Sequence, residues 1–275
     1  MSIEVQALAS GSSGNSILVR NGRTALLIDA GIGIKRLSAT LLGLQIDPTD
    51  LSAILITHEH SDHTIGAVRM ANRYGIPLVA NAKTLDAISG AARVANQILD
   101  PGVEQSVGSL AVRSFPISHD AAQPCGFTIE GGGARICNVT DTGVLSDTIR
   151  EEAIAADLLI LESNHDVKML ERGPYPPHLK KRILGIRGHL SNDAASGLLR
   201  DLAASGSKMS VWLAHLSHMN NTPSAALSCA KRLLSECEGH GLSVEVAKRD
   251  VPSLNWRHGR GIFQLSLFGP RRDNG

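Results

Sequence analysis

Aromatic residues make up only 3% of the 275-residue chain, and the formal net charge is +1 with histidine neutral. A protein that reads single-stranded bases by stacking needs more aromatic side chains, so this composition counts against sequence-reading RNA recognition. The near-zero charge gives no long-range attraction to nucleic acid or to an acidic membrane surface. Any such preference must therefore be local.

The four cysteines lack the spacing of a zinc ribbon or a redox motif. The first residues have neither the basic flank nor the apolar core of a signal peptide, and no apolar run approaches the roughly 20 residues of a membrane span. We therefore expect a cytoplasmic protein with reduced thiols and no membrane association. The sequence does not indicate an oligomeric state.

No linker rich in proline, serine or charge of one sign divides the chain, and 43% hydrophobic content suffices for one large core. Helical spacing, as at residues 35–42 and 193–204, falls between predicted strands. This order favours a single α+β domain in which two mixed sheets face each other under outer helices, a four-layer αββα sandwich. The strands are predicted at residues 3–8, 17–20, 24–28, 51–56, 76–80, 110–117, 126–129, 134–139, 157–161, 210–214 and 244–247.

The strongest chemical signal is residues 57–63, Thr-His-Glu-His-Ser-Asp-His, directly after a predicted strand. Imidazole and carboxylate are the usual ligands of zinc, manganese and iron. Donors this close in sequence converge on metal only from an irregular loop, so we predict one here. The four donors suffice for two partial shells, one from His58 and His60 and one from Asp62 and His63.

Each partial shell needs completion by residues from elsewhere in the chain. His119, Asp141 and His215 each follow a predicted strand, and ends of neighbouring strands can meet at one edge of a sheet. His189 competes with His215 for the last ligand place. Asp29 also ends a strand, and we interpret it as a carboxylate that supports a ligand.

In this order the motif His-x-His-x-Asp-His and the three strand-end residues resemble the metallo-β-lactamase superfamily. Within it, residues 10–16, 118–120, 162–165, 188–191 and 215–221 look like the YycJ (WalJ) branch of metal-dependent hydrolases. The resemblance covers residues 3–249 and implies the αββα fold with two divalent ions, zinc or manganese, with iron as a further candidate. It implies His58, His60 and His119 on the first ion, Asp62, His63 and His215 on the second, and Asp141 bridging both.

The resemblance also implies hydrolysis by a metal-activated water that Asp62 orients. Activity in the YycJ branch is 5′-to-3′ exonuclease action on DNA, so we expect a phosphodiesterase with a nucleic acid substrate. His189 is similar in placement to a histidine of ribonuclease Z and PhnP phosphodiesterases that protonates the leaving oxygen. We therefore predict it as a catalytic general acid or as a phosphate contact.

Two segments bear on the substrate. In the Gly/Ser loop of residues 10–16, Ser12, Gly14 and Asn15 either cradle substrate or form only a glycine turn. The basic, proline-rich residues 173–182 predict a surface loop, which either attracts a phosphate backbone or is merely solvated. The basic residues between Asp141 and His215 are Lys168, Arg172, Lys180, Lys181, Arg182 and Arg187.

Two rival functions stay open. A small-substrate hydrolase of the same fold, acting on a cyclic phosphodiester, lactam or lactone, predicts a deep narrow pocket. A non-enzymatic module that binds DNA or a partner with a structural metal is disfavoured, because structural sites are normally closed by four ligands. For the domain organisation, we expect residues 1–249 to form a metallo-β-lactamase-like hydrolase domain, followed by a C-terminal tail, 250–275, without a predicted structure.

Overall fold

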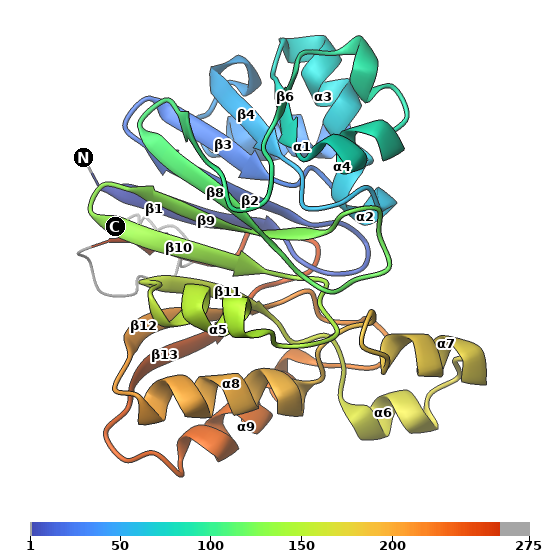
Figure 1. Ribbon diagram of the computed structural model, residues 1–275, viewed down its shortest axis with the longest axis vertical. Helices are drawn as coiled ribbons and strands as arrows, with labels where there is room; N and C mark the ends of the chain where they lie inside the picture. Colours follow the sequence, from blue (N-terminus) through green and yellow to red (C-terminus); the bar gives the residue numbers. More distant parts are fainter. Residues whose placement is uncertain (1, 259–275) are drawn as a thin grey trace, which may run out of the picture.

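Two seven-stranded sheets pack face to face in the computed structural model, and helices cover their outer faces (Figure 1). The structure describes residues 2–258. The predicted single α+β domain with four αββα layers is confirmed.

The first sheet has the order β14-β1-β2-β3-β4-β5-β6. Its meander, β1 (Ile3–Ala9), β2 (Ser16–Asn21) and β3 (Thr24–Ile28), is antiparallel, and the predicted hairpin turn places Gly22 at φ 62°. Parallel strands continue it as β4 (Leu51–Leu55), β5 (Leu78–Ala80) and β6 (Asn96–Ile98). The outer face packs on α1 (Ile34–Gly43), α3 (Ala67–Tyr74) and α4 (Ala82–Ala87).

The second sheet has the order β13-β12-β11-β10-β9-β8-β7. Antiparallel strands β7 (Glu104–Val107), β8 (Leu110–Pro116), β9 (Cys125–Gly131) and β10 (Ala134–Val139) lead into parallel β11 (Leu158–Glu162), β12 (Lys208–Ala214) and β13 (Gly241–Val246). The outer helices are α5 (Asp147–Ile154), α8 (Asn192–Ala204) and α9 (Pro223–Leu234). The side chains of Ser191 and Thr222 cap α8 and α9.

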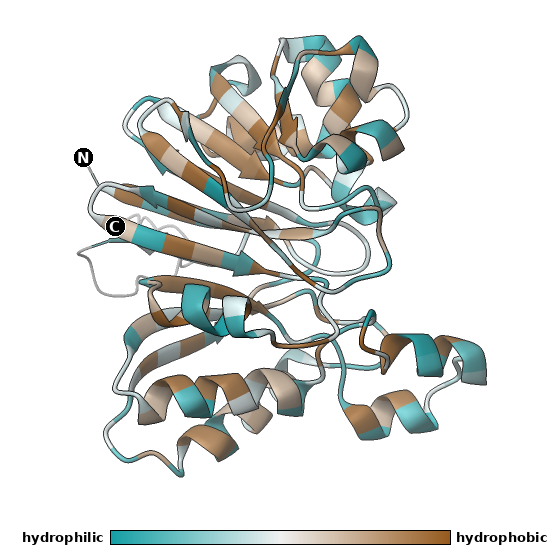
Figure 2. Cartoon of the chain, viewed as in Figure 1, coloured by the Kyte–Doolittle hydropathy of each residue, from teal (hydrophilic) through white to brown (hydrophobic). Residues whose placement is uncertain are grey.

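The core between the sheets follows from the alternation of side chains along each strand. Ile3, Val5 and Ala7 of β1 face the second sheet, which contributes Phe127 and Ile129 of β9 to the same cluster. Figure 2 shows the strands as largely hydrophobic between helices with mixed surfaces. Both sheets are thus buried on two faces, which leaves their ends as the places where polar side chains collect.

Two local predictions were wrong. Residues 173–182 are not simply a surface loop, because α7 (Pro177–Ile183) begins there, next to α6 (Val167–Arg172), and both project from the sandwich in Figure 1. A proline at the first helical position needs no N–H, so this segment tolerates a helix. Asp62 and His63 lie on a one-turn helix, α2 (Ser61–Thr64), whereas only the first half of the histidine motif is irregular.

The beginning of the predicted tail belongs to the first sheet. The short strand β14 (Asn255–Arg257) pairs antiparallel with β1, and Trp256 packs into the core between the sheets. The domain boundary at residue 249 stays a prediction, and residues 259–275 lie outside the described residues. Across residues 2–258, no helix combines the length and the apolarity needed to cross a membrane.

Candidate metal centre

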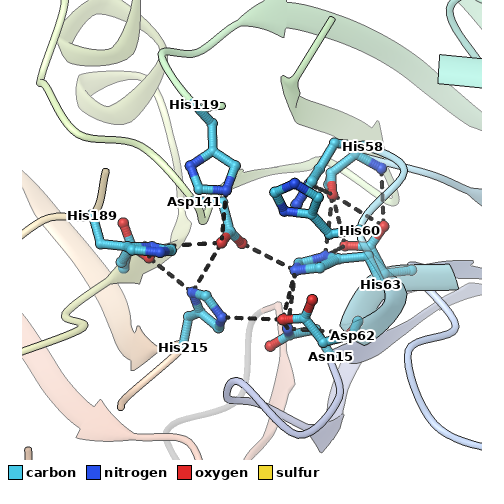
Figure 3. Close-up of polar contacts among 12 residues, drawn as sticks. Asn15, His58, His60, Asp62, His63, His119, Asp141, His189 and His215 are labelled. Carbon is cyan, nitrogen blue, oxygen red and sulfur yellow. Dashed lines mark hydrogen bonds and ion pairs between the residues drawn. The ribbon is translucent and has the colours of Figure 1, made fainter. Parts of the chain in front are cut away.

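Strand ends from both sheets bring the predicted ligands together (Figure 3). His58 and His60 follow β4, and α2 then carries Asp62 and His63. The remaining three ligand candidates, His119, Asp141 and His215, follow β8, β10 and β12. Figure 3 shows all seven side chains pointing toward one space.

The ligand atoms fall into overlapping groups in which all lie within 4.8 Å of one another. Asp141 joins the two sides, since it groups with residues of the histidine motif and also with His215. His215, rather than His189, groups with Asp62 and His63, which supports His215 in the last ligand place. The groups are His58, His60 and His119; Asp62, His63 and His215; His58, His63 and Asp141; and Asp141, Glu162, His189 and His215.

The backbone at these strand ends is strained. Asp29, Asp141 and His215 have φ angles of 60°, 61° and 54°, a left-handed region that costs a non-glycine residue roughly 1–3 kcal/mol. Such conformations persist only where the surrounding structure enforces them. From these positions Asp141 and His215 point into the site, as Figure 3 shows.

Three of the candidate ligand imidazoles place Nδ1 against an oxygen behind the ring. His63 donates to Asp29 Oδ2 at 2.7 Å, His119 to the main-chain oxygen of Gly188 at 3.1 Å, and His215 to Glu162 Oε1 at 2.8 Å. The Nε2 atoms of these rings therefore present lone pairs to the centre. Hydrogen bonds of this kind orient metal-binding histidines in proteins.

These nitrogens face carboxylates, an arrangement that a bound cation would stabilise. His63 Nε2 lies 3.1 Å from Asp141 Oδ2 and 3.5 Å from Asp62 Oδ2, while His215 Nε2 lies 3.6 Å from Asp62 Oδ2. In the described structure, the Nε2 atoms of His58 and His215 are buried without a hydrogen-bond partner. The residues present therefore fit divalent metal.

The electrostatics of the centre agree with this fit. Burial lowers the pKa of His63, yet the carboxylates of Asp29 and Asp141 outweigh it and raise the pKa well above its usual value. Burial raises the pKa of Asp62, but His215 and His63 hold it below its usual value. The centre thus favours ionised carboxylates and positive charge opposite them.

Glu162, at the end of β11, joins the centre to His189. Its Oε1 accepts hydrogen bonds from Nδ1 of His189 at 2.9 Å and from Nδ1 of His215 at 2.8 Å. Burial lowers the pKa of His189, but the charge of Glu162 raises it above its usual value overall. His189 is 20% exposed, so its ring lies where a substrate can reach it.

The Gly/Ser loop packs against the histidine motif and supports it. Asn15 is buried, donates from its main chain to Asp62 O at 2.8 Å, and places its side-chain amide 3.1 Å from His63 Nε2. Gly14 has φ 149°, and an added Cβ would lie 2.4 Å from Gly31 O. Ser12 is exposed at the tip of the loop. Substrate contact by all three residues stays a prediction.

Sequence reasoning missed the role of Glu162 and placed that of Asp29 correctly. Asp29 accepts from the Thr57 main chain as well as from His63, so it holds the start of the motif in place. Glu162 had the same signal, an acidic residue at the end of an apolar strand, but its partners come from distant segments.

Comparison with known proteins agrees with this geometry. Residues 24–220 match the β-lactamase superfamily domain. The chain is 36% identical over 246 residues to exodeoxyribonuclease YycJ of Bacillus anthracis, covering 88% of this chain and 92% of that protein. It is 37% identical over 247 residues to exodeoxyribonuclease WalJ of Streptococcus pneumoniae serotype 2, covering 87% and 91%.

A solved structure shows the same fold. The metallo-β-lactamase fold protein YhfI from Bacillus subtilis aligns with a TM-score of 0.70 at 18% identity, over 94% of this chain and 100% of that chain. The chain therefore belongs to the β-lactamase superfamily, as a metallo-hydrolase similar to YycJ and WalJ over most of its length.

Proposed function

We propose that this protein is a phosphodiesterase that degrades DNA from 5′ to 3′ and uses two divalent ions, zinc or manganese, with iron as the other candidate. His58, His60 and His119 would hold one ion, Asp62, His63 and His215 the other, with Asp141 between them. The names of its two relatives, exodeoxyribonucleases YycJ and WalJ, support DNA as the substrate.

A pair of arginines fixed beside the ligands carries this proposal. Arg187 Nε donates to the main-chain oxygen of His119 at 3.2 Å, and Arg182 Nε donates to Asp120 Oδ2 at 2.5 Å. Both side chains are exposed, so their guanidinium groups can also reach phosphate oxygens. A lactam or thioester substrate has no phosphates for these two guanidinium groups to bind. A DNA strand, in contrast, carries a phosphate at every nucleotide.

Two residues of the chain then act on the attacking water and on the leaving oxygen. When bound, divalent ions supply Lewis acidity and lower the pKa of water. Asp62 is 24% exposed in its side chain and remains ionised, so it can orient the attacking water. His189, held through Nδ1 by Glu162 and 20% exposed, keeps its opposite nitrogen for the substrate and can protonate the leaving oxygen.

The proposal places the reaction in the cytoplasm. Cys125, Cys137, Cys229 and Cys237 are all free, and free thiols are usual in a reducing compartment.

A nuclease assay on end-labelled single- and double-stranded DNA, with zinc- or manganese-loaded protein, tests the function. We expect Asp62→Asn to lower the rate by about a hundredfold or more, because it removes the charge that orients the attacking water and helps to hold an ion. Asp86→Asn, on the exposed surface of α4, is the matched control and should cut at the wild-type rate. A wild-type protein inactive on DNA with every divalent metal, or an Asp62→Asn variant as active as wild type, would contradict the proposal.

A further inference from the structure

Ile186 is the most exposed large hydrophobic side chain in residues 2–258, at 72%. It lies on the segment of residues 184–188, which connects α7 to His189. Two further apolar side chains are exposed, Leu184 at 48% on the same segment and Val144 at 37% next to Gly143, which packs against Ile186 O. An apolar tip therefore stands beside a site that is otherwise polar.

The tip is held rigidly against the candidate ligands. Ile186 O accepts a hydrogen bond from Ser118 Oγ at 2.8 Å, and Gly188 O accepts from His119 Nδ1 at 3.1 Å. Gly143 packs so closely that an added Cβ would lie 2.4 Å from Ile186 O. The segment cannot withdraw without disturbing His119, so the Ile186 side chain has a fixed place relative to the reaction.

The burial of the metal centre indicates a role for this apolar tip. His58, His63 and Asp141 are 0%, 0% and 2% exposed, so a scissile phosphodiester must enter the protein to reach them. A single strand drawn away from its complement can approach these buried groups more closely than a base-paired duplex. Proteins that unstack DNA cover the exposed base step with an apolar side chain.

We propose that Ile186 packs against the terminal base pair of a DNA duplex while the 5′ strand is drawn into the site. Arg182 and Arg187, on either side of Ile186 in the sequence, would hold the backbone phosphates of the separated strand. This inference rests on the proposed exonuclease function. It makes Ile186 a residue that selects the form of the substrate and takes no part in the chemistry.

The test compares Ile186→Ala with wild type on three substrates of one sequence: a blunt duplex, the same duplex with mismatched pairs at the 5′ end, and the single strand. Removing an apolar contact to a base should lower kcat/KM on the blunt duplex roughly tenfold. The mismatched duplex and the single strand should be cut at the wild-type rate, because their ends are already open.

Ile154→Ala is the matched control, since Ile154 is 52% exposed at the end of α5, just before β11 starts, whereas Glu162 ends that strand. It should leave all three rates unchanged, and Ile186→Leu should retain activity on the blunt duplex. A full rate of Ile186→Ala on the blunt duplex, or an equal loss on all three substrates, would overturn the role of Ile186 alone. A wild-type protein that cuts no DNA would overturn the proposed function and this inference with it.

Discussion

Glu162 is fully buried and accepts hydrogen bonds from four groups. Besides His189 and His215, the main-chain N–H groups of Thr142 and Leu190 donate to its Oε2 at 3.1 and 3.0 Å. Burial alone would raise the pKa of this carboxyl, but His189 and His215 lower it to about 2. The ionised side chain therefore fixes a metal-ligand candidate and the proposed acid at once.

Glu162→Gln should damage both roles without unfolding the protein. The amide NH₂ would face N–H donors, so His215 or the main chain loses its acceptor, and we expect metal affinity to fall about 10–100-fold. Hydrolysis of a dinucleotide should fall further than that of an activated nitrophenyl diester, because only the former needs a proton from His189. Metal titration by calorimetry and paired rate measurements check this.

Glu152→Gln is the control. Glu152 is a buried glutamate of α5 that pairs with Arg113 of β8 and Arg135 of β10. It should lower stability while metal affinity stays as in wild type. Unchanged metal affinity in Glu162→Gln would show that Glu162 does not position His215.

Among single residues, the sequence indicated the candidate metal ligands and Asp29, but not the other residues that hold the ligands in place. His58, His60, Asp62 and His63 were predictable because their spacing is unusual in itself. Asn15 and Glu162 act through residues 47 and 53 positions away, Asp62 and His215. No local pattern reports such pairs, since each depends on where two strands end in space.

Between elements, the site depends on how closely α2 sits against the turn after β3. An added Cβ on Gly31 would lie 1.6 Å from Asp62 O. The main chain of Ala30 also accepts from Gly66 at 2.8 Å, just beyond α2. Glycine is therefore required here for close approach of two backbones and not for a turn.

Gly31→Ala should displace Asp62 and His63, so we expect loss of metal binding and at least about a hundredfold loss of hydrolysis. Gly33→Ala, two residues on, is the matched control, because nothing lies within 4 Å of an added Cβ there. Metal titration and thermal unfolding of both variants check this. A Gly31→Ala variant that binds metal like Gly33→Ala would show that the backbone contact does not set the geometry.

The strength of the local pattern decided which elements the sequence revealed. Long apolar runs such as β4 and β11, and the caps at Ser191 and Thr222, follow from local rules. The edge strand β6 is exposed at every residue, so no apolar periodicity indicated it. The short strand β14 gains its stability from pairing with β1, some 250 positions away, at Gln6 and Asn255.

In the whole molecule, the centre exists only when both sheets are packed together. The first sheet contributes the histidine motif, and the second contributes His119, Asp141 and His215. The fold class followed from the order of strands and helices, and the position of His119, Asp141 and His215 after predicted strands made them candidates, whereas their assignment to two ions came only from the resemblance. Packing across the shared core brings like-charged and lone-pair-bearing groups together, and a bound cation would stabilise that arrangement.

Metal removal should therefore destabilise the entire domain. A ligand that binds only the folded state contributes about 2.7 kcal/mol at a hundred times its Kd. For a domain of this size, each kcal/mol moves Tm by about 2–4 °C, so protein dialysed against EDTA should melt roughly 5–10 °C below protein reloaded with zinc or manganese. Asp141→Asn keeps the shape of the side chain but loses its charge, so its Tm should respond far less to the same metals. Equal Tm values for stripped and reloaded wild-type protein, or a full Tm shift in Asp141→Asn, would contradict this prediction. Either result would mean that the buried Nε2 atoms of His58 and His215 do not bind cations that Asp141 also holds.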